Sequence, residues 1–178
     1  MVFQRLFRTR PARAAGEALY ASAAHQARDP AFYRQLGVAD TGEGRFELYS
    51  LHVALLVLRL KGEAGAAPEV SQALFDRFVR ALDDGLREMG VGDLVVGKRM
   101  RKLGEAFYGR TRALEEALQG GDRAALDEAM ARTVLEDGGD RAQAPGLADY
   151  VVRAHAWLAG QGTEALVQGQ VSWPEVMS

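Results

Sequence analysis

Six basic side chains gather between Lys98 and Arg112, and they are the strongest candidates for a site in this chain. The same fifteen residues hold a single acid, Glu105. A cluster of this kind suits recognition of an anionic or polar partner surface, although an exposed basic face that is merely solvated fits the pattern equally well. The members for which we predict an electrostatic contact with a partner are Lys98, Arg99, Arg101 and Lys102.

Residues that would support catalysis or metal binding are scattered. His25, His52 and His155 fall on three different predicted helices, and none has the spacing of a metal motif. Asp83 and Asp84 are adjacent, so on a helix they point about 100° apart and make a poor acid–base pair. The chain has no cysteine, which excludes disulfides and thiolate chemistry. We therefore predict no catalytic residue, no metal and no cofactor, and we expect His52 to be a hydrogen-bonded core histidine.

The overall charge hides an uneven distribution. The 178 residues carry 22 basic and 24 acidic side chains, a net charge of −2. Residues 1–13 hold four arginines and no acid. When residues 1–13 and 98–112 are both left out, the rest of the chain has 12 basic and 23 acidic residues. The sequence thus predicts an acidic body with two basic patches. A hydrophobic content of 48% and this length predict a single domain with a sizeable core.

The elements that would position these residues are helices. Apolar residues recur at intervals of three and four, and alternating β-branched runs with tight hairpin turns do not appear. We predict an all-α, single-domain bundle of about six or seven helices, with a long central helix near residues 94–119 and an apolar, buried one at 46–61. The other predicted helices span 14–28, 31–36, 69–89, 122–136, 146–159 and 164–167.

The long helix at 94–119 has distinct faces. An apolar seam running from Val96 through Phe107 to Leu118 should pack into the core, and Asp93 is predicted to cap the helix. Gly97 and Gly104 share one flank. Because each interior glycine costs a helix about 1 kcal/mol relative to alanine, we predict either a tight internal helix crossing or a partner contact there.

The N-terminal segment is amphipathic if helical. It places Phe3, Leu6 and Phe7 on one face, flanked by Arg5 and Arg8, as in a short helix on an anionic membrane surface. A disordered arm and a segment packed on the domain are the alternatives. No continuous apolar stretch of secretory type follows, so we expect no export. We divide the chain into a basic arm (1–13), a helical domain (14–168) and a tail (169–178).

One run of residues resembles a known family. Gly-Val-Gly-Asp at 90–93, Val-Gly-Lys-Arg-Met-Arg-Lys at 96–102 and Glu-Ala-Phe-Tyr-Gly-Arg at 105–110 together resemble the core signature of the ubiquinol–cytochrome c chaperone family. The resemblance implies a non-enzymatic assembly factor for the cytochrome bc1 complex that binds newly made cytochrome b or another subunit. It further implies a bacterial member that is monomeric or weakly associating and lies at the cytoplasmic face of the inner membrane.

The resemblance also widens the predicted partner site. Phe107, Tyr108, Gly109 and Arg110 join the basic cluster at or beneath a recognition surface. The alternatives are that Phe107 is simply core and that Arg110 forms an internal salt bridge to a neighbouring helix. The alternative function is that of a helical module that binds RNA, the ribosome or anionic lipid through the same basic helix.

Overall fold

The fold is built from helices, as predicted. The computed structural model describes residues 2–88, 90 and 92–177, and the side chains of these except at 2–9, 93 and 94. This part of the chain contains no strand, and two of its eight α-helices are only five residues long. In chain order the elements are α1 (Val2–Gln26), α2 (Pro30–Arg34), α3 (Gly42–Leu60), α4 (Ala67–Glu88), α5 (Asp93–Gly120), α6 (Arg123–Arg132), the short 3-10 helix η1 (Arg141–Gln143), α7 (Ala144–Ala159) and α8 (Thr163–Val167).

Helix α3 lies at the centre of the bundle and packs against α1, α4, α5 and α7. Its residues from Leu51 to Leu56 are all buried, which confirms the predicted apolar helix. The helix begins four residues before the predicted start, because the Thr41 hydroxyl caps it by accepting the Gly44 amide at 3.1 Å. Gly44 packs so closely on the Ala39 carbonyl that a β-carbon would clash, which explains a glycine in this first turn.

Helices α1 and α4 form the tightest crossing. A β-carbon at Gly16 would lie 2.7 Å from backbone atoms of Ala73 and Leu74, so the backbones touch there. The internal crossing predicted at Gly97 and Gly104 is wrong, because a β-carbon at either position would have nothing within 4 Å. Each position therefore has room for a β-carbon.

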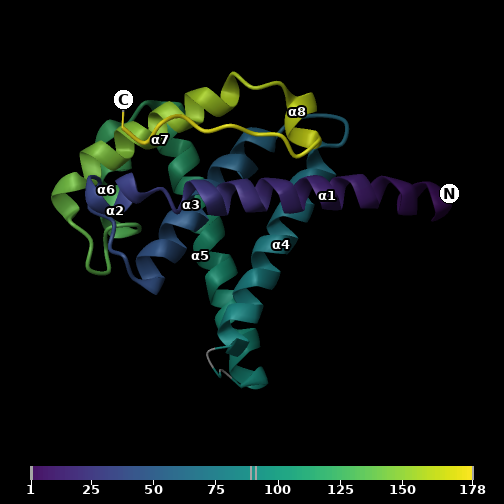
Figure 1. Ribbon diagram of the computed structural model, residues 1–178, viewed down its shortest axis with the longest axis horizontal. Coiled ribbons are helices and arrows are strands. Elements are labelled where there is room, and N and C mark those ends of the chain that lie inside the picture. Colours follow the sequence, from purple (N-terminus) through teal and green to yellow (C-terminus); the bar gives the residue numbers. More distant parts are fainter. Residues whose placement is uncertain (1, 89, 91, 178) are drawn as a thin grey trace.

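Helix α1 also extends well beyond the bundle (Figure 1). It runs without a break from Val2, whereas the sequence predicted a helix from residue 14 preceded by a separate arm. Pro11 lies inside it. The membrane-facing residues predicted for the arm, Phe3, Arg5, Leu6, Phe7 and Arg8, have side chains outside the described part, so that contact stays a prediction.

Helices α4 and α5 form a long hairpin that projects from the body, away from the N-terminal helix (Figure 1). With 28 residues α5 is the longest helix described, as expected. Its cap residue is Gly92, so Asp93 lies one position inside the helix instead of capping it. At the other end Gly121 adopts a left-handed conformation (φ 61°) and closes the helix.

A buried hydrogen-bond chain joins α1, α3 and α7. His52 Nδ1 lies 2.7 Å from the Leu48 carbonyl, and its Nε2 lies 2.8 Å from the Tyr150 hydroxyl. Because a carbonyl only accepts, Nδ1 carries the proton and Nε2 accepts from Tyr150. Gln26 then donates to the same hydroxyl at 3.3 Å. Burial lowers the pKa of His52 to about 4, and the predicted core histidine is confirmed.

The C-terminal segment packs back onto the bundle. Trp173 donates from its indole to the Ser22 hydroxyl at 3.1 Å, and its ring lies 5.0 Å from that of His52. Val176 is buried as well.

Across the described residues, no helix has the length and apolar content needed to cross a bilayer.

Candidate functional site

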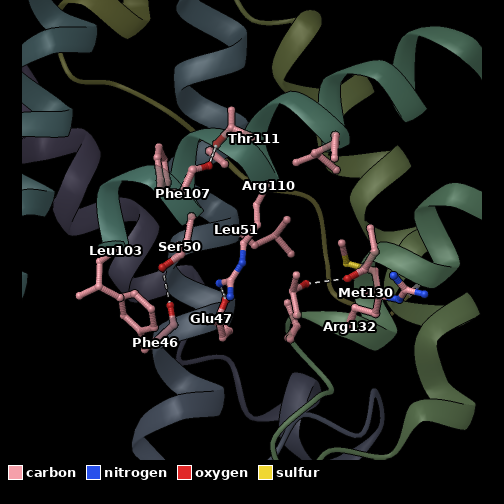
Figure 2. A pocket seen from close by; sticks show the side chains of 17 residues that line it. Phe46, Glu47, Ser50, Leu51, Leu103, Phe107, Arg110, Thr111, Met130 and Arg132 are labelled. Carbon is pink, nitrogen blue, oxygen red and sulfur yellow. Dashed lines mark hydrogen bonds and ion pairs between the residues drawn. The ribbon is translucent and has the colours of Figure 1, made fainter. Parts of the chain in front are cut away.

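An apolar groove opens between α3, α5 and α6 (Figure 2). Its volume is about 230 Å³. Each of the three helices contributes large apolar side chains, and the loop that follows α6 completes one wall. The principal lining residues are Phe46, Leu51, Leu103, Phe107, Met130 and Val134.

The hydroxyl groups in the groove wall are already satisfied. Ser50 donates to the Phe46 carbonyl at 2.8 Å, and Thr111 donates to the Phe107 carbonyl at the same distance. Thr133 likewise donates to the Ala129 carbonyl at 2.7 Å. Each hydroxyl turns back onto the preceding turn of its own helix, so these residues present mainly methyl and methylene groups to the groove.

One ion pair spans the groove. Arg110 on α5 reaches across to the carboxylate of Glu47 on α3, and Figure 2 shows the two side chains meeting in the middle of the pocket. The Glu47 side chain is only 15% exposed, whereas that of Arg110 is 41% exposed. The alternative of a salt bridge from Arg110 to a neighbouring helix is therefore confirmed. Arg132, at the other edge, pairs with Glu128 of its own helix.

This arrangement suits binding of apolar side chains. Removing an apolar side chain from water contributes about 1.5–3 kcal/mol, and the groove offers hydrocarbon on three sides for it. The lining contains no histidine. Among the residues that the structure describes, no three or more His, Asp or Glu side chains lie close enough to hold a metal ion.

The predicted basic residues lie on the projecting part of α5. Lys98, Arg99, Arg101 and Lys102 are all exposed. Arg101 pairs with Glu105 at 3.0 Å, but no described acidic residue pairs with the other three. This outward face adjoins the groove, because Ala106 and Ala113 follow on the same side of α5 and line it.

The run from Phe107 to Arg110 divides between two surfaces. Phe107 is 6% exposed and packs in the core at the base of the groove, as its place in the seam predicted, and Arg110 crosses that groove. Tyr108 points to another flank, where it is 59% exposed and its ring lies 5.2 Å from that of Phe75. Gly109 faces open space. These four neighbours therefore do not form one recognition surface.

The groove residues from α3 and α6 were not predicted as a site. Glu47, Phe46 and Met130 come from segments far from α5 in the sequence, and only the packing of the helices brings them together. One signal existed for Glu47. It is an acid in the first turn of the predicted apolar helix at 46–61, and the sequence offered a salt bridge from Arg110 to a neighbouring helix as an alternative.

The fold and groove define the class of protein: an all-helical binding protein whose candidate site is an apolar groove crossed by an ion pair. The chain belongs to the ubiquinol–cytochrome c chaperone family, whose model matches residues 34–173. The resemblance carried by the α5 run is thus confirmed. No curated protein matches the chain.

A solved structure agrees with this assignment. The crystal structure of the Cbp3 homolog from Brucella abortus is 37% identical and superposes with a TM-score of 0.86. The match covers 99% of this chain and 98% of the other. All three walls of the groove fall within the family match, and the family supports a role as an assembly chaperone of the bc1 complex.

Proposed function

We propose that this protein holds an apolar segment of newly made cytochrome b in the groove between α3, α5 and α6 and thereby assists assembly of the bc1 complex. The observation that carries the proposal is the groove itself, an apolar hollow of about 230 Å³ within the family match. A membrane protein that has not yet folded exposes apolar helices, and these require cover until they pack.

The groove fits a temporary holder of such a segment. Its volume of about 230 Å³ accommodates side chains from one face of a client helix, in the manner of an amphipathic helix laid into a groove. A site of this size binds moderately, because association entropy offsets much of the gain from burial. Moderate affinity suits a chaperone that must release its client. Its action would be stoichiometric, at the cytoplasmic face of the inner membrane where the client emerges.

Site-specific photo-crosslinking tests this proposal. Ala106 and Ala113 are exposed residues on the α5 wall of the groove, so each can be replaced by benzoylphenylalanine without disturbing the core. Val152, an exposed residue of α7, provides the control position. We expect irradiation of cells to join cytochrome b to positions 106 and 113 only. The proposal is overturned if neither groove position captures the client, or if Val152 captures it equally well.

A further inference from the structure

We propose that the projecting α4–α5 hairpin is a membrane contact, in which Lys98, Arg99 and Lys102 bind phosphate groups of anionic lipids and Val95 enters the interface. This inference goes beyond the proposed function, since it concerns lipid and not the client protein. It rests on the exposure of these four residues, their lack of partners and the shape of the molecule.

The four residues share one face of α5. At about 100° per residue, Val95, Arg99 and Lys102 fall within roughly 60° of one another, and Lys98 lies about 40° beyond this sector. All four side chains are exposed, and Val95 keeps 49% of its surface in water. Protein surfaces that lie at a lipid headgroup layer combine apolar side chains with cations in this way.

The three cations differ from the other basic residues of α5 and α6, which are all in ion pairs. Arg101 and Arg112 pair with acids one turn along their helix, and Arg123 and Arg132 do the same on α6. Lys98, Arg99 and Lys102 have no such partner among the described residues. Their charges are therefore free to interact with phosphates.

The shape lets a flat anionic surface reach these residues. The hairpin projects from the bundle, so a membrane can meet its end while the acidic body stays at a distance (Figure 1). The acids of the hairpin lie mainly on α4. Asp84 and Glu88 are each two residues from the buried Leu86, so they point to the opposite side of that helix.

Lipid fits this face better than RNA does. Binding of single-stranded RNA uses aromatic side chains on which bases stack, and the described residues of this face include none. Tyr108 lies on another flank and packs against Phe75. A long polyanion would also meet the acidic body, because the chain carries a net charge of −2.

The absence of cysteine makes a direct test possible. A single cysteine at Val95 (Val95→Cys) can carry an environment-sensitive fluorophore such as NBD on the full-length protein. Val152→Cys is a matched control, because Val152 is also an exposed helical valine, 42% exposed against 49% for Val95. Each labelled protein is mixed with two kinds of vesicle. One kind contains phosphatidylcholine alone, and the other also contains about 30% phosphatidylglycerol, which gives it the negative surface of an anionic membrane.

We expect the NBD group at position 95 to brighten and shift to the blue with anionic vesicles only. The triple variant K98Q/R99Q/K102Q should bind these vesicles about 100-fold more weakly, because each cation at an anionic surface contributes about a factor of five. The variant R28Q/R34Q/R141Q removes the same charge from exposed positions at another part of the protein and should retain the response.

Three results would overturn the proposal. One is an unchanged probe at position 95, and the second is an equal response at position 152. The third is RNA that displaces the protein from vesicles at physiological salt, which would assign the basic face to nucleic acid. None of these results depends on cytochrome b, so the groove proposal can fail or succeed separately.

Discussion

Arg110 and Glu47, 63 residues apart in the sequence, form an ion pair across the apolar groove. The pair connects α5 to α3 and neutralises a carboxylate that is 85% removed from water, given its 15% exposure. A buried carboxylate without this partner would be strongly disfavoured. The ion pair therefore links two walls of the groove through their side chains.

The first prediction concerns this ion pair. Arg110→Gln should destabilise the fold by about 1–3 kcal/mol, because it leaves Glu47 without its partner in a mostly buried position. The double variant with Glu47→Gln should lose less than the sum of the single changes, by about 1 kcal/mol. Urea unfolding of all four proteins measures this coupling. Strictly additive effects would mean that the two side chains do not interact in solution.

The second prediction concerns the space inside the groove. Ala106→Trp should fill it from the exposed α5 side and change the free energy of unfolding by no more than about 1 kcal/mol. The photo-crosslink from position 113 to the client should be lost. Ala156→Trp makes the same change on the exposed face of α7 and should leave the crosslink intact. A persistent crosslink in Ala106→Trp would place the client elsewhere.

The third prediction follows from the low pKa of His52. The unfolded imidazole binds a proton below about 6.5, whereas the folded one does so only below about 4. Between these values the unfolded state takes up a proton that the folded state does not. Stability should therefore fall as the pH falls through this window, by up to about 3 kcal/mol.

Unfolding measurements at pH 7 and pH 5 test the assignment to His52. In His52→Asn the stability at pH 7 should drop, because the hydrogen bonds to Leu48 and Tyr150 are disturbed. The loss between pH 7 and pH 5 should become smaller than in the wild type. Exposed His155 provides the control, and His155→Asn should keep the wild-type pH dependence. An unchanged slope in His52→Asn would contradict a low pKa at this residue.

The fourth prediction contrasts two helical glycines. Gly16→Ala should destabilise the protein by about 1–3 kcal/mol, because its β-carbon would meet the backbone of α4 at 2.7 Å. Gly104→Ala should stabilise it by about 0.5–1 kcal/mol, since α5 is open at that position. Thermal or urea unfolding of the two variants gives the sign directly. Destabilisation by Gly104→Ala would mean that this flank is packed after all.

The fold was largely predictable because helical periodicity is a local property. The apolar run in α3, the length of α5 and the hydrogen-bonded His52 were each expected from the spacing of residues along one helix. The cap of α6 is local as well, since the Asp122 carboxylate accepts the Ala125 amide at 3.0 Å. The predicted helix crossing was wrong because a crossing depends on how one helix meets another. The glycine that permits a close crossing is Gly16 and not Gly104, and periodicity alone does not distinguish them.

The site was predictable only in part for the same reason. The exposed cations of α5 and the buried Phe107 follow from the faces of a single helix. The groove requires α3 and α6 to approach α5, and no local pattern contains that information. Tyr108 illustrates the limit, since it is adjacent to Phe107 in the sequence but lies on a different surface.

The central claim is that the groove serves assembly of the bc1 complex. The most direct measurement is the amount of assembled complex, by haem b absorbance and native gel, in a strain lacking this protein and complemented with wild type, Ala106→Trp or Ala156→Trp. We predict a selective loss of the complex that wild type and Ala156→Trp restore and Ala106→Trp does not, with other respiratory complexes intact. Normal bc1 levels in the deletion strain, or full restoration by a stably folded Ala106→Trp, would contradict the account.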